Sequence, residues 1–401
     1  MHSGFIRTKQ LLVLLSIAGK MKNNSPSQKI WNRFKRNKLA FGGLIFILLL
    51  MLVGILGYLI TPDQTPYANT QKLQISKAKP GSTFKFLIVE RYKGIPQVNF
   101  FQKMLFGQPA SFRSIPITSY SVVNDQVLVY EYIGVEEQAM ETTYKMSELC
   151  NTCLLPSKLG NTAQLFEQSN IYEQTFYLGT DIYGRDLLSR LILGIRVSLS
   201  VGLMAVLISL FIGVSLGAIA GYFGGKTDSL ISWFMNVIWS LPSLLLVIAI
   251  SFALGKGFWQ IFIAVGLSTW VDVARLVRGQ VMSLKEVEFV EAAKALGFST
   301  TRTIAKHILP NVAGPILVVA SANFASAILL ETGLSFLGFG AQPPMPSWGT
   351  MIKEHYGYII MDAAYLAVLP GLAIMLTVYA FNLLAIGLRD AFDVKGQNVS
   401  V

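Results

Sequence analysis

Residues 39–60 read LAFGGLIFILLLMLVGILGYLI and contain no Asp, Glu, Lys or Arg. A helix needs about 20 mostly apolar residues to cross the hydrocarbon core of a bilayer, which is about 30 Å thick. The stretch meets that length, and a strongly basic segment precedes it. It therefore predicts a transmembrane helix, and the rest of the chain is interpreted from this starting point.

The composition of the whole chain indicates a membrane protein. Of its 401 residues, 53% are hydrophobic and only 14% are charged, whereas soluble domains carry about 25% charged residues. The mean hydropathy is +0.52. These values exclude a soluble multidomain protein and a disordered chain, and two cysteines are too few for a disulfide scaffold.

Further uncharged stretches of similar length predict more transmembrane helices. They are residues 197–225, 229–255, 307–330 and 363–388. A sixth helix is expected at 257–277, although Asp272 and Arg275 interrupt its end. Because these two residues are three positions apart on a helix, we expect them to form an ion pair.

Residues 332–352 are also uncharged, but they contain four glycines and three prolines. So many helix breakers argue against a lipid-facing span, because exposed irregular backbone is not tolerated in hydrocarbon. We therefore expect a re-entrant loop that packs against the rest of the protein.

The distribution of charge predicts the orientation. Residues 1–38 hold nine Lys or Arg and no acidic residue, so this basic tail is expected in the cytoplasm. Six crossings return the C-terminal tail 393–401 to the same side and make the loop 275–311 cytoplasmic. The net charge of +11 is thus mainly a topology signal, and a nucleic-acid partner is not expected.

The predicted fold is an all-α polytopic membrane protein with six transmembrane helices and both termini in the cytoplasm. An outer insert, 61–177, separates the first helix from a region of five helices at 178–392. Residues 11–18 are apolar and follow Arg7 and Lys9, so a signal peptide was weighed. A cytoplasmic tail, or a start at Met21, is preferred, and the sequence does not decide between these two.

The insert contains stretches of alternating or β-branched character, such as FKFLIV at 84–89 and VLVYEY at 127–132. They predict short strands in a small mixed α/β or mainly β domain. Cys150 and Cys153 form a lone CxxC that could be a redox pair or half of a metal site. Because a zinc site would need two more ligands and the insert has no histidine, a structural disulfide or two idle thiols is favoured.

Between the fourth and fifth predicted helices, residues 288–311 read EFVEAAKALGFSTTRTIAKHILPN. Good helix formers precede Gly297, and Ser299 is a plausible N-cap for a second helix. Small Ala292 and Ala293 allow another surface to approach closely. The pattern predicts a short, rigid helical docking element.

This segment resembles the EAA motif in the membrane subunits of bacterial ABC importers. The residues that match are Glu291, Ala292, Ala293, Gly297, Leu309 and Pro310, at the motif's spacing. His307 takes the place of the usual isoleucine, which resembles the peptide branch of the family. The resemblance implies that these seven residues couple the chain to cytoplasmic ATPases.

Other segments resemble C-type permeases of the dipeptide, oligopeptide and nickel family. They are LGTDIYGRDLLSRL at 178–191, GLSFLGFGAQPPMPSWG at 333–349, GYFGG at 221–225 and the pair Leu241-Pro242. The resemblance covers 29–60 and 178–392, and leaves out most of the insert. For Asp181 and Asp186, helix capping and pairing with Arg185 or Arg190 are favoured over a receptor-docking role.

Glu331 lies at the outer end of the fifth predicted helix, where a carboxylate is a candidate for function. It could line the translocation path or bind a substrate amino group; equally, it could cap the following loop or pair with Lys353. Residues 224–227, GGKT, do not make an ATP site, because the first glycine of that motif would fall on Ala220.

The resemblance implies an integral membrane permease subunit of a di/oligopeptide importer in the bacterial inner membrane. Its expected partners are a homologous second permease, two cytoplasmic ATPases, an extracytoplasmic binding protein and the lipid bilayer. No enzymatic activity, cofactor or metal is expected of this chain. The alternatives are import of nickel or another small solute, and a membrane-embedded sensor or enzyme with a ligand-binding outer domain.

Overall fold

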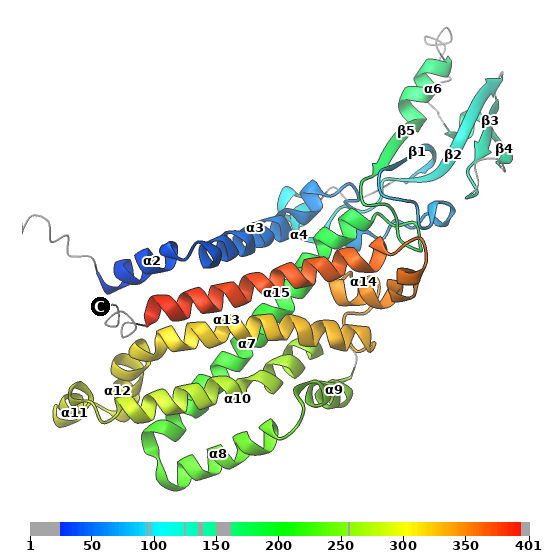
Figure 1. Ribbon diagram of the computed structural model, residues 1–401. Coiled ribbons are helices and arrows are strands. Elements are labelled where there is room, and N and C mark those ends of the chain that lie inside the picture. The colour runs from blue at the N-terminus through cyan, green and yellow to red at the C-terminus, as the bar shows by residue number, and fades with distance from the viewer. Residues whose placement is uncertain are drawn as a thin grey trace, which may run out of the picture.

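The computed structural model describes residues 25–92, 94, 98–123, 126–134, 139–149, 162–255 and 257–393. Long helices lie side by side in a bundle, and a small β-sheet stands at one end of it (Figure 1). The predictions for residues 11–18, for Cys150 and Cys153 and for most of the C-terminal tail fall outside the described residues.

Five helices of the described chain are long and apolar enough to cross a membrane. They are α3 (Lys38–Ile60), α7 (Leu187–Phe223), α10 (Phe258–Leu284), α13 (Leu309–Phe336), which continues a helical segment that begins at Thr300, and α15 (Tyr365–Phe392). Each coincides with a predicted transmembrane stretch. Helix α7 begins ten residues earlier than the sequence pattern suggested, because its first turns bury polar side chains inside the protein.

The stretch 229–255 was expected to be one helix, but it belongs to two. Helices α8 (Gly225–Trp239) and α9 (Ser243–Leu254) meet at an angle of 94°. The bend lies at Pro242, which has no N–H to continue the helical ladder. The described part of the chain therefore has five candidate spans, or six if this bent pair counts as one.

The basic segment before α3 is helical where it is described. Helix α2 (Pro26–Arg36) begins after Ser25, whose hydroxyl accepts a hydrogen bond from the Gln28 N–H. It packs against the end of α15, where the Phe34 ring lies close to Gly387. The first predicted domain thus includes a helix as well as a tail.

The insert is built on a five-stranded antiparallel sheet of order β4-β3-β2-β1-β5. Its strands are β1 (Ser82–Arg91), β2 (Phe112–Val123), β3 (Gln126–Glu131), β4 (Met140–Lys145) and β5 (Ile171–Phe176), and the short helices are α4 (Phe100–Phe106), α5 (Met146–Leu149) and α6 (Thr162–Asn170). The stretch 84–89 lies within β1, and 127–132 coincides with β3 except for its last residue. In β3 the buried residues, Val127 and Val129, alternate, whereas the middle of β1 is buried on both faces, at Phe86 and Leu87.

The two ends of the insert are held together where they meet the bundle. The Lys72 N–H donates to the Tyr183 carbonyl at 3.0 Å, and the Thr180 N–H donates to the Ala78 carbonyl at 3.1 Å. The Ser76 hydroxyl donates to the Ile182 carbonyl. The segment that enters the sheet, 72–78, and the segment that leaves it, 178–183, therefore lie side by side directly before α7.

Helices α7 and α10 approach each other closely along a row of glycines. Gly213, Gly217 and Gly221 follow one another every four residues, which places them on one face of α7. A Cβ atom at Gly217 would lie 2.5 Å from the Ala274 carbonyl oxygen, and one at the other two would lie 2.7 Å from a carbonyl oxygen of α10. Only glycine permits this separation, as in other membrane helix pairs.

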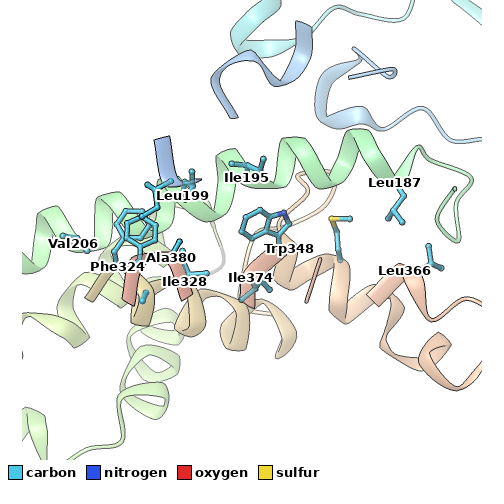
Figure 2. Close-up of a cluster of buried hydrophobic side chains, with 14 of the residues drawn as sticks. Leu187, Ile195, Leu199, Val206, Phe324, Ile328, Trp348, Leu366, Ile374 and Ala380 are labelled. Carbon is cyan, nitrogen blue, oxygen red and sulfur yellow. The ribbon is translucent and has the colours of Figure 1, made fainter. Parts of the chain in front are cut away.

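The segment after α13 forms a loop that returns to the bundle. It ends in α14 (Trp348–His355) and the 3₁₀ helix η5 (Tyr356–Ile360). Trp348 is 1% exposed and lies between Ile195 of α7 and Ile374 of α15 (Figure 2). Its indole N–H donates to the Leu191 carbonyl at 3.0 Å. The loop packs against protein, as its glycines and prolines predicted.

Replacing Gly217 by Leu is expected to destabilise the bundle by about 1–3 kcal/mol, because the side chain would force α7 and α10 apart. Gly42→Leu is the matched control, since a Cβ at Gly42 has no neighbour within 4 Å. The measurement is the fraction of detergent-purified protein that remains monodisperse after heating. Equal melting of the two variants would show that the close approach is not needed.

Candidate functional site

The loop between α10 and α13 opens with helix α11 (Glu288–Ala295), whose two faces differ. Val290 and Ala293 are buried, and Val290 packs in a cluster with Val281 and Ile308. Glu291 and Ala292 are exposed on the other face. The two adjacent alanines therefore have different surroundings: Ala293 faces the bundle, and Ala292 faces outward.

Helix α11 ends in a turn at Gly297. This glycine has φ of +76°, a left-handed conformation that residues with a Cβ resist. Its N–H donates to the Lys294 carbonyl, and the Phe298 N–H donates to the Ala293 carbonyl at 3.1 Å, which closes the end of the helix. A Cβ at Gly297 would have no neighbour within 4 Å, so only the backbone conformation requires glycine here.

The helical segment after Gly297, the second arm of the loop, runs without a break into α13. It begins with α12 (Thr300–Thr303), where the Ser299 hydroxyl accepts from the Arg302 N–H, as predicted. A π-helical turn, η4 (Ile304–Ile308), follows it. The His307 ring of this π-helical turn stacks on the Phe298 ring with centroids 5.5 Å apart. The stacking holds the turn at Gly297 against the second arm.

The structure divides the seven predicted coupling residues into two groups. Glu291, Ala292 and Gly297 are exposed, and with Leu296 we name them the tip surface. Of the other four, Ala293 is buried, His307 and Leu309 are half-buried, and Pro310 is exposed but belongs to the start of α13. Sequence analysis missed Leu296, which is 74% exposed; an apolar residue directly before the turn glycine was the available signal.

A buried ionic cluster connects the segment before α7 with α14. The Asp181 carboxylate accepts a hydrogen bond from the Arg185 guanidinium, which also donates to Glu354 at 2.9 Å. Arg190 lies 3.7 Å from Asp181. The pairing predicted for Asp181 is confirmed, and the second carboxylate partner of Arg185, Glu354, is far away in the sequence.

Asp186 has the predicted role of a helix cap. Its carboxylate accepts from the Ser189 N–H at 2.8 Å, which makes it the N-cap of α7.

Oxygen or nitrogen atoms of Asp181, Glu354 and His355 lie within 4.8 Å of one another, which is close enough to hold a metal ion. Because Arg185 and Arg190 together already balance the charges of the two carboxylates, the geometry does not require a metal cation there.

A cavity of about 480 Å³ lies among α8, α9, α10 and α13. Its lining combines apolar side chains with a few polar ones: Ser243, Ser268, Thr269, Asp272, Asn323 and Ser326. The Asn323 amide is held in place because it donates to the Thr269 carbonyl at 3.2 Å. Such a mixture suits a site through which a polar solute passes.

Arg275 does not use the partner that the sequence suggested. Its guanidinium donates to the Asn236 side chain at 2.8 Å and lies 3.9 Å from the centre of the Trp239 ring. Both partners belong to α8, so Arg275 connects α10 to the neighbouring helix. The expectation of a pair with Asp272 considered one helix only and could not include this contact.

Glu331 is completely buried near the end of α13. Its carboxylate accepts from the Ser335 hydroxyl at 2.6 Å, one turn further along the same helix. Glu331 is absent from the lining of the 480 Å³ cavity. The structure therefore places it in the packing beneath the returning loop, and a role in translocation stays a prediction.

A second cavity, of about 760 Å³, lies where the insert meets the bundle. Lys72 contributes to its lining, and its ammonium group lies 3.5 Å from the centre of the Phe86 ring and donates to the Tyr172 hydroxyl. Burial lowers the pKa of Lys72 to about 8, and the nearby Asp63 carboxylate opposes this only in part. The cavity thus contains a buried ammonium with little charge compensation.

A bundle of apolar helices with an exposed helical loop at one end has the construction of a membrane component of a transporter. Residues 213–395 match the family described as binding-protein-dependent transport system inner membrane component. Residues 25–80 match the N-terminal transmembrane domain of oligopeptide transport permease C.

Two permeases of similar sequence support this assignment. The chain is 45% identical to the oligopeptide transport system permease protein OppC of Haemophilus influenzae over 55% of this chain and 71% of that one. It is 42% identical to the dipeptide transport system permease protein DppC of Bacillus subtilis over 58% and 72%. A chain of the MetNI methionine ABC transporter is similar in structure with a TM-score of 0.40 and 18% identity, over 50% of this chain and 97% of that one.

The chain belongs to the family of binding-protein-dependent transport system inner membrane components. The family resemblance expected from the motifs is thereby confirmed. The protein is a multi-pass component of the bacterial inner membrane. Neither family match extends over residues 81–212, which include the whole β-sheet.

The two alanines of α11 should respond differently to a larger side chain. Ala293→Leu is expected to overpack the buried face of the helix at a cost of about 1–3 kcal/mol, and so to speed tryptic cleavage after Lys294. Ala292→Leu should leave the cleavage rate unchanged because Ala292 is exposed. Equal rates in the two variants would contradict the assignment of the faces.

Proposed function

We propose that the chain is one of two homologous permease subunits that form the path of an ATP-driven di/oligopeptide importer. In this proposal six spans cross the membrane, the bent pair α8–α9 being one of them, and both termini are cytoplasmic. The sheet then lies outside the cell, where an extracytoplasmic binding protein delivers substrate. The printed names of the relatives, permeases for oligopeptides and dipeptides, support this substrate class.

The observation that carries the proposal is the rigid connection from the tip surface to the cavity. Residues Thr300–Phe336 form one helical segment, which begins three residues after Gly297. The same segment supplies Asn323, Ser326 and Leu330 to the lining of the 480 Å³ cavity. A displacement at the tip surface can therefore reach the cavity through a single rigid element.

The tip surface suits a docking role because it combines exposed apolar and charged groups on a short rigid helix. Leu296 and Ala292 present apolar area to a partner, and Glu291 adds a charge at the edge. ATP-driven closure of two cytoplasmic ATPases would move this surface in each permease. The α13 segment would act as the lever that opens the path to one side or to the other.

The chain contributes no ATP site in this scheme. Residues 224–227 lie where α7 ends and α8 begins, between two helices. A phosphate-binding loop of this type follows a strand. Binding and hydrolysis of ATP therefore fall to the partner subunits.

The proposal is tested by purifying the chain with its co-expressed neighbours and measuring ATP hydrolysis in nanodiscs. Di- and oligopeptides presented with the binding protein are expected to raise the hydrolysis rate several-fold. Stimulation by nickel or another small solute, with none by peptides, would overturn the substrate class. Purification of an active transporter without any ATPase would overturn the mechanism.

Gly297→Val is expected to weaken coupling while the protein still inserts. A β-branched residue in the left-handed conformation costs about 1–2 kcal/mol, so the turn should rearrange and move Leu296. Peptide-stimulated hydrolysis should fall several-fold, measured against Gly42→Val, which has equal free space but lies on α3. Unchanged stimulation in Gly297→Val would remove the tip surface from the coupling mechanism.

A further inference from the structure

Helix α4 of the insert has an unusual surface for a segment outside the bundle. It reads FFQKMLF and has no buried residue. Phe100, Phe101, Leu105 and Phe106 are 63%, 71%, 52% and 68% exposed. A water-exposed domain rarely presents so many large apolar side chains on one short helix.

Arg196 of α7 holds the end of α4 against α3. Its guanidinium donates to the Ile55 carbonyl of α3 at 2.7 Å and to the Leu105 carbonyl of α4 at 2.8 Å. It also donates to the carbonyls of Gly54 and Met104. Two of the last carbonyls of α4 are thus satisfied by a side chain that lies at the level of Gly54 and Ile55.

Gly54 and Ile55 lie within the transmembrane part of α3, not at its end. Ile55 is five residues before the end of α3 at Ile60, which corresponds to about 8 Å along the helix axis at 1.5 Å per residue. The apolar residues of α3 cover little more than the hydrocarbon core, about 30 Å thick. The C-terminal end of α4 therefore lies below the outer boundary of the hydrocarbon.

Contacts at the helix end fix this depth. Gly107, the C-cap of α4, is buried against the Tyr58 ring of α3, and the Gln108 N–H donates to the Gln64 carbonyl at 2.9 Å. Figure 1 shows α4 alongside the end of α3 that faces the sheet. Helix α4 consequently cannot move away from the bilayer without breaking these contacts.

We propose that α4 is inserted among the acyl chains of the outer leaflet and anchors the sheet to the bilayer surface. Its exposed side chains continue the apolar surface of α3, where Leu52 and Ile55 are also exposed. Arg196 satisfies two of its end carbonyls, those of Met104 and Leu105, which lowers the cost of placing this helix end in hydrocarbon. Lys103, the one charge in α4, is half-buried and lies on a long stem that can reach the headgroups.

The anchor would fix the height and tilt of the sheet above the bundle. Strand β2 follows α4 after five residues, so the chain enters the sheet directly from the bilayer. The inference requires that α3 crosses the membrane, and it takes from the proposed function that the sheet lies outside the cell. Its failure would leave the proposed transport function untouched.

The test places the photoreactive p-benzoylphenylalanine at position 101 of the full chain, assembled with its partner subunits in nanodiscs of one defined lipid. Leu52 on α3 is the lipid-facing reference position, and Val123 at the end of β2 is the water-facing one; both are more than half exposed. After irradiation, the mass of the permease is measured. Position 101 is expected to give as much lipid adduct as position 52 and several-fold more than position 123.

Two results would overturn the proposal. Cross-linking of position 101 to another subunit, without lipid adduct, would show that α4 is a protein interface. No adduct at position 101, while position 52 reacts, would show that α4 is in water. If the variant at 101 does not assemble, Phe106 offers a second exposed position on the same helix, and the same two outcomes decide.

Discussion

Close contact with α7 is the constraint on which the rest of the structure depends. This helix has glycine at several of the points where another element comes nearest. Gly213, Gly217 and Gly221 admit the backbone of α10, and a Cβ at Gly202 would lie 2.5 Å from the Phe324 ring of α13. In a membrane the hydrophobic effect gives little force between helices, so close van der Waals packing must hold them together.

The same helix organises the outer end of the bundle. Gly194 leaves room for the Trp348 ring, and the Leu191 carbonyl accepts its indole proton, so α14 is fixed on α7. The buried pair of Arg185 with Asp181 and Glu354 joins the start of α7 to that segment. A buried ion pair of this kind contributes geometry more than stability, because desolvation offsets most of its attraction. The returning loop is therefore positioned by two independent contacts with α7.

Much of this architecture follows from local pattern. The long apolar stretches, the two alternating strands, the break at Gly297 and the cap at Ser299 were all predictable, because each depends on neighbours a few residues away. The bend at Pro242 lay within an uninterrupted apolar stretch, where hydropathy alone could not reveal it. Residues 333–349 were recognisable as a loop, but their place against Ile195 and Ile374 was not.

The candidate site shows the same division. Sequence spacing identified Glu291, Ala292, Ala293 and Gly297, but it could not tell the exposed alanine from the buried one, nor find Leu296 beside them. Arg275 was assigned to Asp272 because both are on one helix, whereas its partners Asn236 and Trp239 are on another. The sequence by itself determined that the chain is a membrane protein with a short helical loop broken at Gly297, since apolar length and helix termini are local properties. Only the tertiary structure decided which face of α11 is free, which groups Arg185 and Arg196 bind and what lines the cavity, because those depend on contacts between segments far apart in the chain.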